Sequence, residues 1–313
     1  MVKYTVVESY ENYGRCLKIS NDTIEAYVTI DVGPRIIKFG FCGGQNMMFN
    51  DLERQTIWEG EEYDAYFFKG AVSYLYGGHR IWVTPERKPE TNYPDNEPVE
   101  VKYTDKGVVF IPPVQKKNDI QLELEINMDS DGANMQVLNR VINVRDTEQE
   151  FAVWTISVMN KGGLEIVKHS DVDTGLLPNR VISLWPYSNP ADYRFYNGKK
   201  FMSVKHDAAA DRAFKFGTNN QLGKAVYALN GDVFRKEWAQ FDASKPYPDG
   251  GVSFESYTSD LVLELEVLSS VEKVAPGKSA VLEEKWSLVS EEFMPDARDD
   301  AELEEFWNKV WAK

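Results

Sequence analysis

Two glutamates stand two positions apart near the end of the chain, in the run LVLELEV at 261–267. Side chains alternate between the two faces of a strand, so Glu264 and Glu266 share one face, about 7 Å apart. The run at 252–257 places Glu255 beside them if the two runs pair as a hairpin. Clustered carboxylates raise one another's pKa, which suits proton transfer near neutral pH. The spacing therefore predicts three glutamates on one surface, able to act as acid or base.

The same pattern occurs a second time, in QLELEIN at 121–127, where Glu123 and Glu125 alternate with apolar residues. Strands with one solvated face show this alternation, so either pair of glutamates can also be plain sheet surface. The periodicity leaves both interpretations open, because only the surroundings of each pair separate them.

A histidine and an arginine stand together at the start of a proline-rich segment, YGGHRIWVTPERKPETNYPDNEPV at 76–99. Gly77 and Gly78 permit a positive φ or a close approach to a ligand. His79 offers a proton near pH 7, and Arg80 offers a planar fork of donors for hydroxyls, carboxylate or phosphate. One interpretation is a catalytic pair, and the other is a hydrogen-bonded loop fixture.

Aromatic residues occur in or beside polar loops at Trp82, Tyr93, Trp185 and Tyr187. An aromatic platform under the ring, with carboxylate and guanidinium groups on the hydroxyls, is the mixture that binds sugars. The candidate substrate-binding residues are Arg80, Trp82, Tyr93, Trp185, Lys236 and Glu255. Three further tryptophans lie within strand-like runs and are expected to pack in the core: Trp154, Trp238 and Trp286.

The elements that must position these residues are β-strands nearly throughout. More than a dozen short runs rich in β-branched and aromatic residues are separated by turn signals such as Asn230-Gly231. Without interleaved helices, they favour an all-β class with two large antiparallel sheets packed in one domain over 1–313. The expected exceptions are a helical turn near 50–56 and a C-terminal helix at 296–312.

The C-terminal helix carries its apolar residues at i, i+3 and i+4 spacing, at Leu303, Phe306, Trp307, Val310 and Trp311. This pattern predicts that the helix packs on the outside of a sheet. A partner-binding helix is the alternative.

Composition narrows the classes of partner. The 313 residues carry a net charge of -15, which argues against nucleic acid and anionic membranes because phosphate binding needs clustered Lys and Arg. No apolar run reaches the roughly 18 residues of a spanning helix, and the N-terminus lacks a signal-peptide pattern. A cytoplasmic protein with a small-molecule partner is expected. The sequence leaves the oligomeric state open.

Motifs for several other chemistries are missing from the sequence. There is no HExxH, paired CxxC, Walker sequence, G-x-S-x-G or GxGxxG after a strand. No cofactor and no metal are therefore expected. His169 with Asp171 and Asp173 could ligate a metal, but KHSDVD is interpreted as loop polarity. The chain has only two cysteines, Cys16 and Cys42, which excludes a disulfide framework and leaves a single bridge open.

The order of several segments resembles the galactose mutarotase-like superfamily, in a branch related to the aldose 1-epimerases. The segments are VTIDVGPRIIKFGFCGGQNMMF, GGHRIWVTPE with YPDNEPV, LLPNRVISLWPYSN and LVLELEVLSSVEKVAPGKSAVLEEKWSL. The resemblance covers nearly the whole chain and implies a β-supersandwich, in agreement with the strand pattern.

The resemblance also implies a reaction, the opening and reclosing of a sugar ring. By position, Glu266 resembles the glutamate that takes the proton from the anomeric hydroxyl, with Glu264 as its rival. His79 and Arg80 would then be the proton donor and the hydroxyl clamp, held rigidly by the proline-rich loop. The epimerases have a catalytic histidine in a central strand, and the corresponding stretch FAVWTISVMNKGG departs from the family because it carries Trp154 and Thr155 and no histidine.

Three functions follow as hypotheses. The first is an aldose 1-epimerase-like isomerase acting on a free or phosphorylated sugar. The second is a carbohydrate-binding protein without catalysis, which the missing histidine favours. The third is a glycoside-cleaving enzyme that uses the clustered glutamates.

Overall fold

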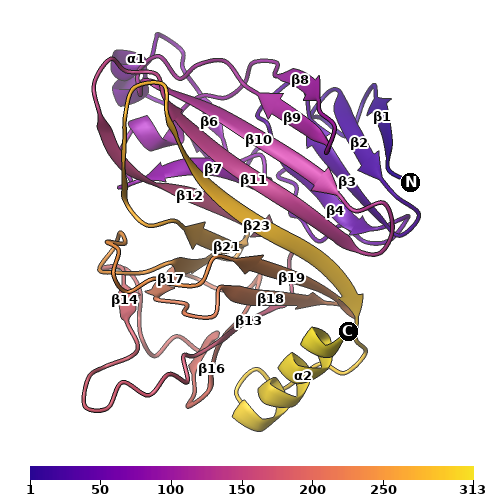
Figure 1. The fold of residues 1–313 in the computed structure, drawn as a ribbon, viewed down its shortest axis with the longest axis vertical. Coiled ribbons are helices and arrows are strands. Elements are labelled where there is room, and N and C mark those ends of the chain that lie inside the picture. The colour runs from indigo at the N-terminus through magenta and orange to yellow at the C-terminus, as the bar shows by residue number, and fades with distance from the viewer.

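The computed structural model describes residues 1–313 and consists mainly of two large antiparallel sheets packed against each other (Figure 1). The eleven-stranded sheet has the order β1 (Lys3–Val7), β2 (Cys16–Ser20), β3 (Ile24–Thr29), β4 (Ile36–Phe41), β7 (Gly78–Thr84), β12 (Gln149–Met159), β21 (Leu263–Leu268), β20 (Phe254–Thr258), β17 (Phe214–Thr218) and β14 (Ile182–Leu184), and β22 (Glu272–Val274) pairs with β12. The ten-stranded sheet has the order β15 (Phe195–Asn197), β16 (Phe201–Lys205), β13 (Leu164–Lys168), β18 (Lys224–Leu229), β19 (Asp232–Trp238), β23 (Ser279–Ser290), β11 (Asn134–Asn143), β10 (Ile120–Met128), β9 (Val108–Ile111) and β8 (Glu100–Tyr103). The remaining elements are a two-stranded ribbon of β5 (Ile57–Trp58) and β6 (Ser73–Tyr74), helix α1 (Glu61–Tyr66), a 3₁₀ turn (Glu90–Asn92) and helix α2 (Asp300–Ala312).

The main core lies between the two sheets, because each strand buries alternate side chains on the side that faces the other sheet. In β10, Ile120, Leu122 and Leu124 are buried, whereas Gln121 and Glu123 between them are partly exposed. Side chains from both sheets form one apolar cluster of 44 buried residues. The predicted all-β class and the two large antiparallel sheets are confirmed.

Strands from four separate parts of the sequence become neighbours in the middle of the eleven-stranded sheet, in the order β7, β12, β21, β20 and β17. β20 and β21 form the predicted hairpin, which places Glu255 directly opposite Glu266 and Tyr257 opposite Glu264. The three glutamates therefore project from the same face of the sheet, as the period of two predicts.

Helix α2 covers the outer face of the ten-stranded sheet near the C-terminus (Figure 1). Leu303, Phe306, Trp307 and Val310 pack against side chains of β13, β16, β18 and β19. The prediction of a C-terminal helix on the outside of a sheet is confirmed, although α2 begins four residues later than the predicted 296–312. It begins at Asp300 because the Asp299 carboxylate accepts the Ala301 and Glu302 N–H groups as an N-cap.

Asp299→Ala is expected to reduce the free energy of unfolding by about 1 kcal/mol, because two N–H groups at the helix start lose their acceptor. The change is measured by chemical denaturation. Asp211→Ala is the control, since Asp211 is an exposed aspartate that caps no helix, and its effect should stay within about 0.5 kcal/mol. Equal losses in the two variants would contradict the capping role.

Two local expectations are wrong. Residues 50–56 form no helical turn, and the short helix α1 lies further along the chain, at Glu61–Tyr66. The His79-Arg80 pair is not at the mouth of a loop, because Gly78–Thr84 is strand β7, between β4 and β12. The proline-rich loop starts only after this strand.

The Gly77-Gly78 pair serves close packing of the backbone. Both residues have positive φ, 94° at Gly77 and 69° at Gly78. A Cβ atom would lie 2.1 Å from the Phe49 carbonyl oxygen at Gly77 and 2.4 Å from the Ile36 carbonyl oxygen at Gly78. Only glycine fits between these neighbouring segments.

No helix in the structure has the length and apolar character needed to cross a bilayer.

Candidate functional site

A cleft of about 540 Å³ opens on the outer face of the eleven-stranded sheet, over its central strands. Its aromatic lining consists of Trp58, Trp82, Trp154, Trp185, Tyr187 and Tyr257. Its charged lining consists of Arg80, Glu86, Lys88, Lys215, Glu264 and Glu266. The volume lies within the roughly 300–1,000 Å³ of small-molecule sites, and such sites combine apolar walls with a few polar groups.

The register of the central strands sets the floor of the cleft. Arg80, Ile156 and Glu266 lie opposite one another across β7, β12 and β21, and Glu255 continues this row on β20. Glu264 stands two residues before Glu266 on β21 and belongs to the next row. Neighbouring strands lie about 4.8 Å apart. Arg80, Glu264 and Glu266 therefore line one small area of the cleft, whereas Glu255, a predicted substrate-binding residue, is 1% exposed and does not line it.

Lys215 on β17 connects two of the glutamates. Its Nζ lies 2.7 Å from Glu255 Oε2 and 2.9 Å from Glu266 Oε2, and the Trp154 indole N–H donates to Glu266 Oε2 at 2.8 Å. Burial alone would lower the pKa of Lys215. The negative charges of Glu266 and Glu255 together have the larger effect, so the pKa of Lys215 is raised. Lys215 also lies 4.8 Å from the ring centre of Trp154 and 4.6 Å from that of Trp185. These contacts hold Lys215 as a charged group in the cleft floor.

The surroundings of Glu264 raise its pKa to near neutral pH. Burial raises its pKa, the Glu266 charge raises it further, and Arg80 and Lys215 only partly oppose this, which gives a value of about 7. The side chain of Glu264 is 8% exposed, whereas Glu266 is 0% exposed at the bottom of the cleft. Glu264 can therefore carry or release a proton in the pH range where acid–base catalysts operate.

Arg80 faces the cleft and contacts two of its tryptophans. Its guanidinium carbon is 3.8 Å from the ring centre of Trp82 and 5.9 Å from that of Trp58. The nearest carboxylate oxygen, of Glu264, is 4.0 Å from Arg80 Nη2. Burial lowers the pKa of Arg80 to about 10. The group remains a cation at neutral pH and is aimed at the ligand space.

His79 does not lie in the cleft, in contrast to the expectation that it works beside Arg80. Successive side chains on a strand point to opposite faces, so His79 points into the space between the sheets. It is 0% exposed. Its Nδ1 lies 2.9 Å from Ser157 Oγ, and its Nε2 lies 2.9 Å from Asn139 Oδ1. Burial lowers the pKa of His79 to about 4, so it is a neutral ring with both nitrogens already occupied.

Lys236 belongs to the same interior cluster and does not reach the ligand space, although it was a predicted substrate-binding residue. It is 0% exposed, with Nζ 3.2 Å from Glu284 Oε2 and 3.0 Å from Ser157 Oγ. Glu284 also accepts hydrogen bonds from Trp286 Nε1, at 2.7 Å, and from Thr155 Oγ1. We call His79, Asn139, Thr155, Ser157, Lys236, Glu284 and Trp286 the inter-sheet network. It ties β7 and β12 to β11, β19 and β23.

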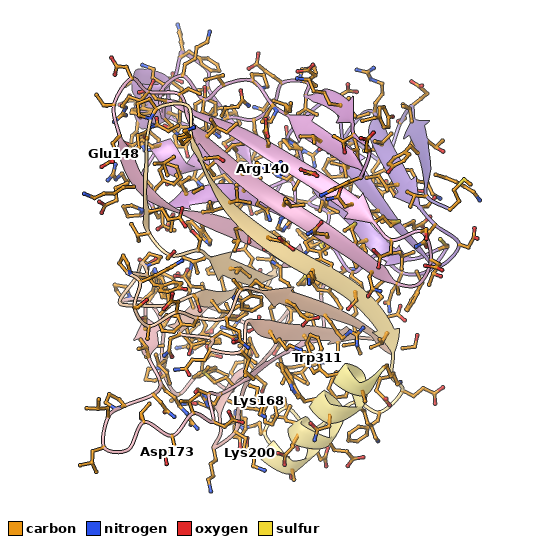
Figure 2. The ribbon with its side chains drawn as sticks, viewed as in Figure 1. Arg140, Glu148, Lys168, Asp173, Lys200 and Trp311 are labelled. Atoms are coloured by element: carbon orange, nitrogen blue, oxygen red, sulfur yellow. The ribbon has the colours of Figure 1, made fainter.

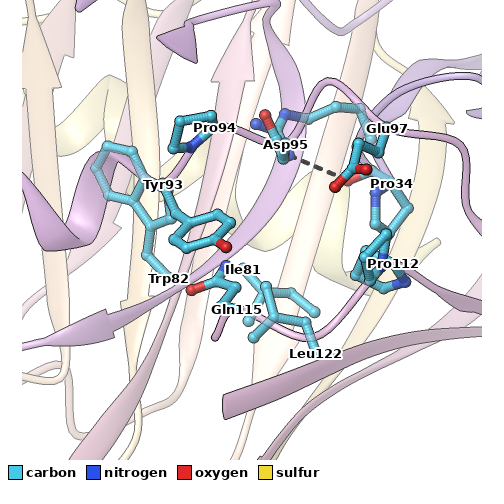
Figure 3. Close-up of a pocket in the computed structure, with 13 residues that line it drawn as sticks. Pro34, Ile81, Trp82, Tyr93, Pro94, Asp95, Glu97, Pro112, Gln115 and Leu122 are labelled. Carbon is cyan, nitrogen blue, oxygen red and sulfur yellow. Dashed lines mark hydrogen bonds and ion pairs between the residues drawn. The ribbon is translucent and has the colours of Figure 1, made fainter. Parts of the chain in front are cut away.

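Tyr93 lines a narrow pocket next to the cleft, with Trp82 between the two (Figure 3). This pocket has only about 30 Å³, enough for a water or two but not for a sugar. Asp95, on its far side, pairs with Arg35 at 2.5 Å. Tyr93 therefore shares this pocket with Trp82 but does not line the cleft.

The second glutamate pair has the surroundings of a sheet surface. Arg140 lies on the outer face of the ten-stranded sheet (Figure 2). It pairs there with Glu123 at 3.6 Å and with Glu125 at 2.6 Å. His169 Nε2 lies 3.0 Å from Asn197 Oδ1, and Asp173 projects on an exposed loop (Figure 2). No group of three His, Cys, Asp or Glu side chains in the chain is placed to hold a metal ion.

Sequence reasoning did not place Trp154 and Lys215 in the cleft, although both contact Glu266 there. Trp154, expected in the core, lies on the cleft side of β12 and binds Glu266, whereas Trp238 and Trp286 are buried as expected. Lys215 was missed because FKFGT was not recognised as strand β17. The signal was a lysine between two phenylalanines, since a strand with Phe214 and Phe216 in the core must turn Lys215 to the other face.

Comparisons with known proteins find similarity in structure but not in sequence. No protein-family model and no curated protein matches the sequence. A galactose mutarotase-like protein from Clostridium acetobutylicum superposes with a TM-score of 0.54 at 12% identity, over 93% of this chain and 99% of that chain. A Klebsiella pneumoniae protein for which aldose 1-epimerase activity is suggested gives 0.55 at 12% identity, over 99% of this chain and 87% of that one.

A similar architecture also occurs in a protein that is not named as a mutarotase or an epimerase. A TPR-domain-containing protein from Parabacteroides distasonis gives a TM-score of 0.56 at 10% identity, over 90% of this chain but only 48% of that chain. At such identities the likeness concerns architecture, and one fold hosts many functions. With its two large antiparallel sheets and its likeness to these structures, the chain has the galactose mutarotase-like fold.

Proposed function

We propose that the cleft binds a monosaccharide and that the protein interconverts its anomers, as an aldose 1-epimerase-like isomerase. One observation carries this proposal. Glu264 and Glu266 stand side by side on β21 at the floor of an aromatic-walled cleft, with Arg80 and Lys215 next to them. Tryptophan and tyrosine rings suit the apolar faces of a pyranose, and the charged groups suit its hydroxyls.

The proposed roles divide acid from base within this pair of glutamates. Glu266 Oε2 accepts from Trp154 and Lys215, while its Oε1 has no partner and is free to take the proton of the anomeric hydroxyl. Glu264, whose pKa is about 7, carries a proton that it can give to the ring oxygen as the bond from that oxygen to the anomeric carbon breaks. The open aldehyde then rotates and recloses by the reverse transfers. Glu264 takes the acid role that the family resemblance had assigned to His79.

Optical rotation tests the proposal. Freshly dissolved α-anomers of several aldoses should reach their equilibrium rotation faster in proportion to the protein added. If the protein accelerates the mutarotation of no aldose in the panel, even at concentrations that saturate binding, the isomerase proposal is contradicted.

The proton on Glu264 gives turnover a predictable pH dependence. Since Glu264 is protonated below about pH 7 and charged above it, a proton donor in this position loses activity as the pH rises through 7. Glu264→Gln cannot donate, so its turnover should be lower by about 10²-fold or more and should lack this step. The measurement is turnover between pH 5.5 and 8.5 for both proteins. If turnover of Glu264→Gln fell with the same pH midpoint as that of the unaltered protein, a group other than Glu264 would cause the step.

A carbohydrate-binding protein without catalysis is the second candidate. The observation in its favour is that none of the three histidines lines the cleft. Tryptophan fluorescence separates the candidates, because four tryptophans line the cleft and should report a bound sugar. Saturable quenching by a sugar whose mutarotation is not accelerated would select the binding function.

A further inference from the structure

We infer that the sugar bound in the cleft carries a carboxylate and that Arg80 is the residue that holds it. This inference rests on the proposed function and adds the class of substrate, a hexuronate-type sugar acid. It comes from Arg80, the one buried cation of the cleft that makes no hydrogen bond within the protein.

The Arg80 guanidinium has five N–H donors and no hydrogen bond within the protein. The residue is 2% exposed, and its Nε is buried without a partner. The one carboxylate within 4.0 Å is that of Glu264, and it lies beyond hydrogen-bond distance. The contact with the Trp82 ring, 3.8 Å from the guanidinium carbon, uses none of these donors. Burial of unsatisfied donors is costly, so the arrangement is that of a group prepared for a ligand.

With Glu264 protonated, as its proposed role requires, the charges of the cleft indicate one negative charge on that ligand. Lys215 is already held between Glu255 and Glu266. Glu86 and Lys88 are exposed at the rim and can offset each other. Arg80 is therefore the one buried cation left for a ligand. A carboxylate supplies one charge and two oxygens in the plane of the guanidinium fork, whereas a phosphate brings nearly two charges and would require a second cation.

The position of Arg80 relative to the glutamates also fits a hexuronate. In such a sugar the carboxylate is attached to the carbon that bears the ring oxygen, and the anomeric carbon is on the other side of that oxygen. Arg80 lies 4.0 Å from Glu264, the proposed donor to the ring oxygen. Glu266, the proposed base at the anomeric hydroxyl, is the next residue of β21 on the same face. A carboxylate on Arg80 thus brings both reacting oxygens towards the two glutamates.

Calorimetric titration with galacturonate, galactose and galactose 6-phosphate, and with the same three forms of glucose, tests the inference. Binding of a uronate should be about 10- to 100-fold tighter than that of the matching hexose, and tighter than that of the phosphate, because a charge-assisted bidentate contact is added. Arg80→Gln should abolish most of this preference, and so should Arg80→Lys, which keeps the charge but lacks the fork. Arg140→Gln, on the outer face of the other sheet, should retain it.

The outcomes separate this inference from the proposed function. Mutarotation of neutral hexoses without any preference for uronates would overturn the carboxylate inference and leave the isomerase proposal standing. Tightest binding of the 6-phosphate, or a uronate preference that survives in Arg80→Gln, would also overturn it. Failure of every sugar to bind would overturn both. The comparison of ligands on the unaltered chain decides the question even if an Arg80 variant fails to fold.

Discussion

Glu284→Ala is expected to lower the free energy of unfolding by about 3–5 kcal/mol, because it leaves Lys236 as an unpaired charge between the two sheets. Both residues are 0% exposed, and their charged groups are 3.2 Å apart. Lys236 lies on β19 and Glu284 on β23, and the removed carboxylate is also the acceptor of Trp286 and Thr155. Urea denaturation measures the loss.

Glu123→Ala is the matched control, since Glu123 pairs with Arg140 at 3.6 Å on a partly exposed surface. Its effect should be about 0–1 kcal/mol. A double variant, Lys236→Met with Glu284→Leu, should recover part of the stability because no charge is left buried and unpaired. If Glu284→Ala cost no more than Glu123→Ala, the inter-sheet network would not contribute to the packing of the two sheets.

Glu266→Gln is expected to reduce turnover of the sugar by about 10²- to 10⁴-fold while the sugar still binds, because the amide keeps the shape of the side chain but cannot accept the proton. Its oxygen can still accept from Trp154 and Lys215, the present donors to Glu266. Lys215 also keeps its contact with Glu255 at 2.7 Å. Rates of mutarotation and titration of binding, measured on the same preparation, separate the two effects.

Glu125→Gln is the control for Glu266→Gln. Glu125 stands in the same alternating pattern, but on β10, where it pairs with Arg140 away from the cleft. Its turnover should equal that of the unaltered protein. Turnover in Glu266→Gln within about threefold of this control would remove Glu266 from the proposed mechanism, since loss of a general base costs far more than that.

The all-β architecture and the face shared by the glutamates could be predicted because both depend on a period of two. In LVLELEV and in the run before it, this period determines which side chains lie together once the strands pair, and Glu255 does lie opposite Glu266. The pattern could not separate Glu264 and Glu266 from Glu123 and Glu125. That difference depends on the neighbouring strands, which supply Lys215 and Arg80 to the first pair and Arg140 to the second.

The role of His79 could not be predicted because it depends on tertiary packing. The glycines and prolines around it are typical of a loop, whereas Gly77 and Gly78 allow β7 to enter the middle of a sheet. Once β7 is a strand, His79 and Arg80 must face opposite sides. Which side holds the cleft follows only from the partners of each face, Lys236 and Glu284 on one side and the tryptophans on the other.

The most direct test of the proposed site is a crystal structure of the protein with its tightest-binding monosaccharide. The account predicts the sugar in the cleft over β7, β12 and β21, with its ring oxygen and anomeric hydroxyl within about 2.6–3.2 Å of the carboxylates of Glu264 and Glu266. A sugar bound elsewhere, or one bound in the cleft with its anomeric carbon turned away from both glutamates, would contradict it.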